Sequence, residues 1–408
     1  MQFRFPTENQ QLHNLSAYAI LSLKLQRRRF PTMDFSIKID QHLETPFKRD
    51  AGIYQDGTVP MYRDVDGTLW AIAGFSHMGH IAMFKGNTID DMEQIYKVNT
   101  NFCVGHADYA YDRIRYPDGV KARGSIWPFG LYICPKTHRF FCFFHNESAW
   151  NGKGTGYDAF GLNTKPNFDS DFRHIGLMHS DDEGRNWTFD RWVITAEDVC
   201  FTEYYNPNND CVIGQKKGQI KVGAGDFSIL VEDEYIYIFY DIITMDTERR
   251  VWIRCDGHVA RTRRRFDGIM GDFVKYYDGA FCEAGNMGKE SVVIPNMWHP
   301  RVAWVEEKQC YIVVGSPLSK NVEEILQSSF LAGRVANILE YRTSTDLIHW
   351  SEPKRISHEG KDFGAHYMAL VDDSVGHQPH VVQGNDFIFL ICNTNQNVER
   401  FTAHFEAR

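Results

Sequence analysis

The sequence predicts an all-β protein, a five-bladed β-propeller with four-stranded blades. Three observations support this fold class. Aromatic residues make up 14% of the 408 residues, and 32 glycines supply many turns. One unit, an apolar strand followed by an acidic or glycine turn and an aromatic strand, occurs five times along the chain. The last copy lacks an outer strand, which an N-terminal segment can supply. A two-sheet sandwich is the alternative, but sandwiches rarely show a regular period of this length.

The five copies of the unit lie at residues 57–74, 124–147, 221–241, 299–316 and 377–393. The third copy is the clearest, because a glycine turn precedes Asp226 and an acidic turn at 232–234 separates two apolar runs. A third strand follows most copies, whereas only residues 400–408 follow the last. We therefore predict that residues 34–41 complete the fifth blade and protect its edge. The aromatic anchors of the second strands lie 71, 96, 74 and 76 residues apart: Trp70, Phe141, Tyr237, Tyr311 and Phe387.

The charge and the apolar pattern of the sequence indicate its domain organisation and its classes of partner. Residues 1–32 are predicted to be a helical or disordered extension, and residues 33–408 a single propeller domain. The positive charges follow the apolar run at 12–26, whereas in a signal peptide they precede the apolar run. The run is also too short and too polar to span a membrane. A net charge of −9 argues against a nucleic-acid partner. We expect a cytoplasmic protein with no membrane partner.

The cysteines are expected to be buried free thiols in a reducing compartment. None of them forms a C-x-x-C pair, and several lie in apolar strand patterns, so a disulfide framework or a zinc site is the weaker alternative. The chain contains nine cysteines: Cys103, Cys134, Cys142, Cys200, Cys211, Cys255, Cys282, Cys310 and Cys392.

Two turns have the pattern called an Asp box. Residues 180–187 read SDDEGRNW, and residues 344–350 read the related STDLIHW. In such a turn the aspartate accepts backbone N–H bonds while the tryptophan packs beneath it. We predict that both turns are structural and connect the third and fourth strands of a blade.

Polar side chains precede each predicted first strand, and in a propeller these positions converge at one mouth of the central channel. Two carboxylates facing each other can cleave an acetal, because one protonates the leaving oxygen while the other activates water or attacks carbon. Tryptophans offer flat faces to sugar rings, and Arg123 or Arg301 can hold a sugar carboxylate or sulfate. The residues at these positions are Gln55, Asp56, Ser125, Trp127, Asp226, Ser228, Trp298, His299, His377 and Gln378.

Residues 55–70 and 223–241 resemble the first and third blades of the five-bladed glycoside hydrolases, the arabinanase and arabinofuranosidase-like superfamily of families 43, 62, 32, 68 and 117. The turn at 344–350 and the run at 259–285 are also similar to this superfamily. The resemblance implies hydrolysis of a glycosidic bond in a plant or algal oligo- or polysaccharide, with no required cofactor. It also implies that Asp56 is the general base or nucleophile, and that Asp226 tunes the acid and orients the substrate.

The resemblance does not assign the general acid, because the superfamily places a glutamate where this chain has MWHP at 297–300. Glu290, His299 and Glu283 are the candidates, and a histidine is a competent acid near neutral pH. Glu147, at the end of a second strand, is either a substrate contact or a solvated loop carboxylate. In related propellers a channel histidine helps to hold calcium, which would give His377 this second role.

Several of these candidate site residues also have a purely structural interpretation, and other functions compete with hydrolysis. Asp56 and Asp226 are also residue types that cap turns, and His299 and His377 can be structural histidines. A non-catalytic carbohydrate-binding propeller and a polysaccharide lyase using histidine and tyrosine are competing functions. A sialidase is disfavoured, since sialidases have six blades and usually several Asp boxes. The sugar, its linkage and the exo or endo mode depend on the loops 84–124, 148–172 and 196–222.

Overall fold

The computed structural model describes residues 35–48, 55–74, 81–98, 114–115, 125–147, 173–195, 218–246, 251–318, 338–364, 366–392 and 397–407. All regular structure in these ranges is β-strand, as predicted. The described residues contain no helix long and apolar enough to cross a membrane. Apart from Phe35 and Ala407, these residues belong to one unit, Ser36–Glu406. The predicted boundary at residue 33 lies outside the described residues and stays a prediction.

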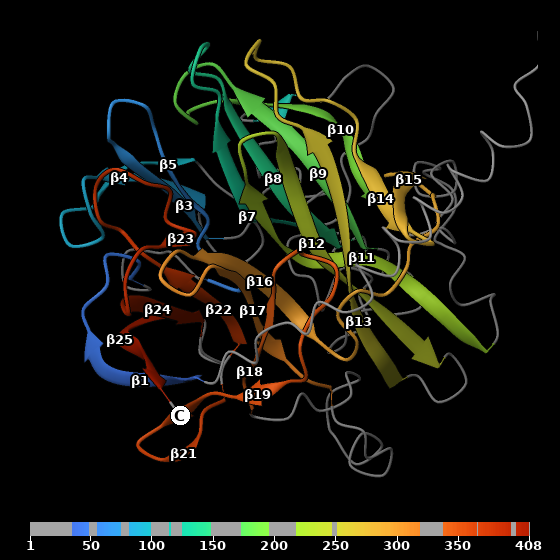
Figure 1. Cartoon of the computed structure of the whole chain (residues 1–408). Coiled ribbons are helices and arrows are strands. Elements are labelled where there is room, and N and C mark those ends of the chain that lie inside the picture. The colour runs from blue at the N-terminus through green and yellow to red at the C-terminus, as the bar shows by residue number, and fades with distance from the viewer. Residues whose placement is uncertain are drawn as a thin grey trace, which may run out of the picture. The chain divides into compact units, whose positions relative to one another are not determined.

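The strands pair mainly with their neighbours in sequence, in five groups of four (Figure 1). The first group is β2 (Met61–Arg63), β3 (Leu69–Ala73), β4 (Ile81–Gly86) and β5 (Glu93–Val98). The second is β7 (Ser125–Ile133), β8 (Phe140–Glu147), β9 (Arg173–Ser180) and β10 (Trp187–Thr195), with β6 (Ile114–Arg115) parallel to β10. The third is β11 (Gln219–Val231), β12 (Tyr235–Asp246), β13 (Val251–Arg263) and β14 (Val274–Tyr277), extended by β15 (Ala280–Ala284).

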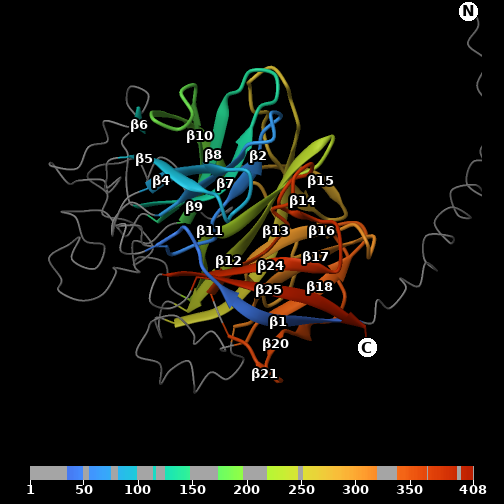
Figure 2. The same cartoon turned by 90° about the vertical axis from the view of Figure 1, so that its left-hand side faces the viewer.

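The last two groups follow the same order. The fourth contains β16 (Trp298–Val305), β17 (Cys310–Ser316), β18 (Glu340–Ser344) and β19 (Lys354–Arg355). The fifth contains β22 (His366–Val371), β24 (Asp386–Cys392), β25 (Val398–Ala407) and β1 (Phe35–Leu43), and β1 also pairs with β20 (Ser357–His358), which pairs with β21 (Lys361–Asp362). Figure 2 shows β24, β25 and β1 side by side. The predicted pairing of the N-terminal segment with the last strand of the chain is therefore observed.

Five groups form four sheets, because one parallel bridge between Gly223 and Arg173 joins the second and third groups. The hairpin predicted at 221–241 is the β11–β12 pair. Both Asp boxes connect third and fourth strands as predicted: Asp182 Oδ1 accepts the Asn186 N–H at 2.8 Å, and Asp346 Oδ1 accepts the His349 N–H at 2.8 Å. The two turns are therefore structural.

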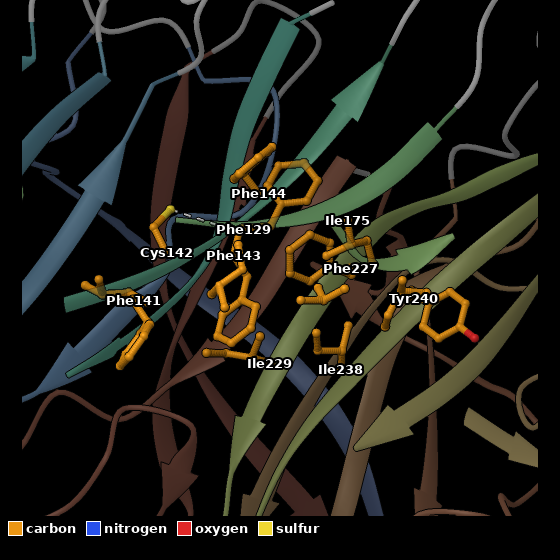
Figure 3. Packing of buried hydrophobic residues seen from close by; sticks show 14 of the residues in the cluster. Phe129, Phe141, Cys142, Phe143, Phe144, Ile175, Phe227, Ile229, Ile238 and Tyr240 are labelled. Carbon is orange, nitrogen blue, oxygen red and sulfur yellow. Dashed lines mark hydrogen bonds between the residues drawn. The ribbon is translucent and has the colours of Figure 1, made fainter. Parts of the chain in front are cut away.

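The core consists of side chains that neighbouring groups bury against each other. The largest cluster combines the first three groups, and Figure 3 shows Phe129, Phe143 and Phe144 of β7 and β8 gathered with Phe227 and Ile229 of β11. A second cluster combines the first and fifth groups, and a third combines the third and fourth. The described cysteines are free thiols, and five of them are buried as expected, whereas Cys282 is exposed. Cys103, Cys200 and Cys211 lie outside the described residues.

One prediction about the fifth group is wrong. The sequence placed its first strand just after His377 and Gln378, but the strand that pairs with β24 is β22. Val381–Val382 instead form β23, which runs parallel to β16 of the fourth group. The error arose because the residues between β22 and β24, 372–385, are a long connection instead of a tight turn. The innermost strands of the five groups are therefore β2, β7, β11, β16 and β22, and all five contribute residues to one cavity.

Candidate active site

Four of the innermost strands carry a β-bulge. The pairing register shifts around Phe129 in β7, around Asp226 in β11, around His299 in β16 and around Tyr367 in β22. A bulge re-aims the side chain at the extra residue and is common beside active sites. The four bulges bring these four residues together, because Phe129 contacts Phe227 and Tyr367, and Tyr367 contacts His299.

Three bulge residues have backbone conformations that non-glycine residues rarely adopt. The φ angles are +26° at Asp226, +58° at His299 and +47° at Tyr367. A positive φ costs a non-glycine residue on the order of 1 kcal/mol, and it persists only where the surrounding structure imposes it. Such strain concentrates at functional sites, so these three residues mark the candidate site.

The Asp226 carboxylate lies at the centre of a set of donors. Trp298 Nε1 donates to Oδ2 at 2.9 Å, and the Tyr367 hydroxyl donates to Oδ1 at 3.4 Å. His299 Nε2 lies 3.3 Å and Arg173 Nη1 3.5 Å from Oδ2. The residue is 3% exposed. A buried carboxylate needs such compensation, because an isolated charge in a protein interior is strongly destabilising.

His299 is fixed by rings and by a second carboxylate. Its imidazole stacks on the Tyr367 ring with centroids 4.0 Å apart and planes 10° apart, and the Trp298 ring lies at 4.3 Å. The His299 backbone N–H donates to Asp241 Oδ2 at 3.1 Å. We call Asp226, Asp241 and His299 the aspartate–histidine cluster, since their ligand atoms all lie within 4.8 Å of one another.

The second group of strands supplies residues that the sequence did not single out. His145 Nδ1, from β8, accepts the Asp226 N–H at 3.2 Å. A Cβ at residue 225 would lie 2.6 Å from His145 Cε1, so a glycine is needed just before Asp226. The Arg173 guanidinium lies over the Trp252 ring at 4.8 Å, and Trp252 packs edge-on against Trp298. Positive charge from β9 and a donor from β16 thus reach the Asp226 carboxylate, while β8 accepts the Asp226 N–H.

Burial and charge give the three members of the cluster different protonation. Burial raises the pKa of Asp226, but His299, His145 and Arg173 outweigh this and hold it below the ordinary value. Burial and the Asp226 charge raise the pKa of Asp241 well above its ordinary value. Burial lowers the pKa of His299 below 6.5, although Asp226 opposes this. The pKa values of the two carboxyl groups are therefore shifted in opposite directions, which favours the charged form of Asp226 and the protonated form of Asp241.

Asp56 immediately precedes a glycine that packs against one of these aromatic residues. It is half-buried, and Gln55 Nε2 fixes its segment by donating to Gly57 O at 3.1 Å and Thr58 O at 2.8 Å. A Cβ at residue 57 would lie 2.0 Å from Cε1 of Phe129, so this glycine packs directly against that ring. The Phe129 ring in turn lies 5.8 Å from Tyr367.

Glu290 lies in a different environment. Its Oε2 accepts from Lys275 Nζ at 2.6 Å, its Oε1 accepts from Lys221 Nζ at 2.8 Å, and its side chain is fully buried. Lys275 Nζ also donates to Thr195 O and Gly288 O. We call Lys221, Lys275 and Glu290 the lysine–glutamate cluster. Glu283 lies on β15, where its carboxylate accepts the Lys289 N–H at 3.3 Å. The structure shows no contact of either glutamate with Asp226.

The other predicted contacts divide between the site and its surroundings. Trp127 is buried and packs edge-on against His145 with centroids 5.5 Å apart. Arg301 is buried two residues beyond His299 and donates to Thr58 Oγ1. Arg123 lies outside the described residues, as does the side chain of Glu147.

His377 and Gln378 lie in the connection between β22 and β24. The Gln378 amide exchanges hydrogen bonds with the Arg63 backbone, and Arg63 Nε donates to His377 O. They therefore contact the last residue of β2. The predicted calcium ion at His377 stays a prediction. The aspartate–histidine cluster fits calcium poorly, because calcium takes six to eight oxygen ligands and Arg173 already pairs with Asp226.

No protein-family model matches the sequence, and a comparison with characterised protein sequences finds no significant match. Solved structures similar to this chain are glycoside hydrolases, as the resemblance predicted. One is a family 117 glycoside hydrolase of the marine bacterium Zobellia galactanivorans, with a TM-score of 0.49, 7% identity and 91% of each chain covered. Another is an exo-β-1,3-galactanase of Phanerochaete chrysosporium, with a TM-score of 0.45, 9% identity, and 90% of this chain and 64% of that chain covered.

A third similar structure is an α-L-arabinofuranosidase of Lactobacillus brevis, with a TM-score of 0.43, 12% identity, and 86% of this chain and 90% of that chain covered. These likenesses are remote in sequence and modest in geometry. We therefore base the functional proposal on this chain's own residues.

Proposed function

We propose that the protein is a glycoside hydrolase built as a five-bladed β-propeller. The five groups of four strands, whose innermost strands contribute to one cavity, support this architecture. The observation that carries the proposed activity is the buried pair of Asp226 and His299, held at strained bulges of adjacent inner strands. Strain and shifted pKa values in one cluster are the combination expected of catalytic groups.

In the proposed reaction His299 is the general acid. Its Nε2 faces Asp226, so Nδ1 is the nitrogen from which a proton would pass to the leaving oxygen of the sugar. Asp226 orients the imidazole and stabilises its charged form, and it accepts from Tyr367 and Trp298 at the same time. Asp226 is therefore a positioning residue in this scheme, which agrees with its burial.

Asp56 is the proposed base or nucleophile. It is half-buried, whereas Asp226, the other carboxylate of the predicted pair, is 3% exposed. A base must reach water or the sugar carbon, so exposure favours Asp56 for this role. In the lysine–glutamate cluster two ammonium groups already occupy both oxygens of Glu290, which disfavours it as the acid.

The test is a screen of plant and algal polysaccharides with chromatographic detection of released sugars. The wild-type protein is expected to release saturated oligo- or monosaccharides from at least one substrate. Asp56→Asn should abolish this release while the unfolding midpoint stays close to that of the wild type. Unchanged release by Asp56→Asn would refute the role of this residue. Binding of a glycan without any release would instead favour a carbohydrate-binding propeller.

A polysaccharide lyase is the second candidate, and the stacking of His299 on Tyr367 favours it. In a lyase a neutral histidine takes the proton beside a sugar carboxylate, and the product carries a new carbon–carbon double bond that absorbs ultraviolet light. The two reactions need opposite forms of His299. Hydrolysis needs the protonated form, so its rate falls as pH rises through the His299 pKa, which lies below 6.5, whereas elimination becomes faster.

A further inference from the structure

The central cavity is lined by a buried cation that no carboxylate of the described residues neutralises. Arg301, on β16, is 9% exposed and lines this cavity. Among the described residues its guanidinium has one hydrogen-bond partner, Thr58 Oγ1, 3.0 Å from Nη1. No described carboxylate forms an ion pair with it, and burial lowers its pKa to about 10. A buried guanidinium with five N–H donors and one neutral acceptor is incompletely compensated.

Other buried arginines of the chain have acidic groups beside them. Arg173 lies 3.5 Å from the Asp226 carboxylate, and Arg400 forms an ion pair with Asp90. Arg342 donates to Pro295 O at 2.7 Å and has the acidic neighbours Glu340 and Glu352, which raise its pKa against the effect of burial. Arg301 is thus distinguished by its electrostatic surroundings and not by burial alone.

The shape and lining of the cavity define what can compensate Arg301. Its volume of about 10 Å³ leaves room for one small particle. Apart from Arg301 and His380 the lining is apolar, with Leu131, Ile229 and Leu370 facing it from three inner strands. His380 Nε2 donates to Val231 O at 3.1 Å, so this nitrogen is already used. A sulfate or a sugar carboxylate with its ring is too large for the space.

We propose that the central cavity is a binding site for one small inorganic anion of the halide class, held by the Arg301 guanidinium. The inner strands of all five groups contribute to the cavity, so an anion there would stabilise all of them together. Because the lining is apolar and offers few donors, the site should prefer weakly hydrated chloride or bromide to strongly hydrated fluoride. The inference goes beyond the proposed activity and does not depend on it.

Thermal unfolding at constant ionic strength tests this site, with sodium gluconate exchanged for sodium chloride, bromide or fluoride. Each tenfold rise of chloride or bromide above the dissociation constant should raise the wild-type Tm by about 2 °C. Fluoride should have no such effect. The halide response should vanish in Arg301→Met and persist in the control Arg342→Met. Equal responses of the two variants, or none in the wild type, would overturn the proposal.

Bromide in wild-type crystals provides a second measurement that does not depend on a variant. An anomalous scattering peak within about 3.5 Å of the Arg301 guanidinium is the expected result. If a sulfated or carboxylated oligosaccharide displaces the bromide peak, Arg301 belongs to a substrate subsite and the proposal of a free ion is wrong. The absence of a peak at saturating bromide would also overturn it.

Discussion

The aspartate–histidine and lysine–glutamate clusters are both buried and ionic, but they are built differently. In the lysine–glutamate cluster Lys275 makes three hydrogen bonds of 2.6 to 2.8 Å and both Glu290 oxygens accept from ammonium groups. In the aspartate–histidine cluster two carboxylates share one region with an imidazole, and two of the three residues have positive φ. In the lysine–glutamate cluster each charged group has a partner of opposite charge. In the aspartate–histidine cluster the pKa values of the two carboxyl groups are shifted in opposite directions.

This difference separates a structural role from a chemical one. A fully compensated ion pair has little reason to exchange protons, and removal of either partner leaves a buried charge alone. A strained cluster with pKa values shifted in opposite directions is arranged for proton transfer at some cost in stability. Variants of the two clusters should therefore fail in different assays.

The largest effect is expected for His299→Gln. Loss of the proposed general acid should lower kcat/KM by about 10²- to 10⁴-fold. The wild-type profile should fall with rising pH at a midpoint below 6.5, because burial lowers the pKa of His299, and the variant should lack this limb. Steady-state kinetics between pH 4 and 8 would measure both. A variant that keeps the wild-type limb would exclude His299 as the acid.

The next effect concerns stability. Lys275→Met leaves Glu290 with one cation and removes the donor to two backbone carbonyls. Breaking a buried pair in this way should lower the free energy of unfolding by about 3–5 kcal/mol, measured by denaturant titration. The control Lys308→Met removes an exposed pair with Glu307 and should cost less than about 1 kcal/mol. Equal losses in the two variants would contradict the comparison.

A third effect is acid destabilisation through buried neutral histidines. Burial lowers the pKa of His258, beside the lysine–glutamate cluster, to about 4 and that of His174 to about 3. The unfolded chain binds these protons near pH 6.5, so their contribution to stability is present above 6.5 and is lost as pH falls toward 4. Each histidine contributes a slope of up to about 1.4 kcal/mol per pH unit. Unfolding of His258→Gln should show a shallower slope, and an unchanged slope would count against this assignment.

The smallest effect is expected for Tyr367→Phe. The ring that stacks on His299 remains, and only the 3.4 Å hydrogen bond to Asp226 is lost. We expect kcat to fall by about 3- to 10-fold with little change in KM. Tyr240→Phe, whose ring stacks on His258 near the other cluster, is the matched control and should retain full activity. A loss of activity in the control but not in Tyr367→Phe would reverse the proposed roles.

The repeat made most of the fold predictable, because each hairpin is local and alternates turn residues with strand formers. The prediction from the repeat was wrong where a long connection joins β22 and β24. For this reason the sequence analysis selected His377 and Gln378 instead of Tyr367 at the fifth inner strand. Asp226, Trp298 and His299 were found because they precede apolar runs. His145 and Arg173 were missed because they lie on second and third strands and reach Asp226 only through packing between groups.

The measurement that tests the central claim most directly compares Asp226→Asn with Glu290→Gln on a saccharide that the wild-type protein cleaves. We predict that Asp226→Asn lowers kcat/KM by about 10³-fold, because His299 loses the carboxylate that orients and charges it. Glu290→Gln should stay within about threefold per folded molecule while its free energy of unfolding falls. Full activity in Asp226→Asn, together with loss of activity in folded Glu290→Gln, would show that the chemistry lies in the lysine–glutamate cluster.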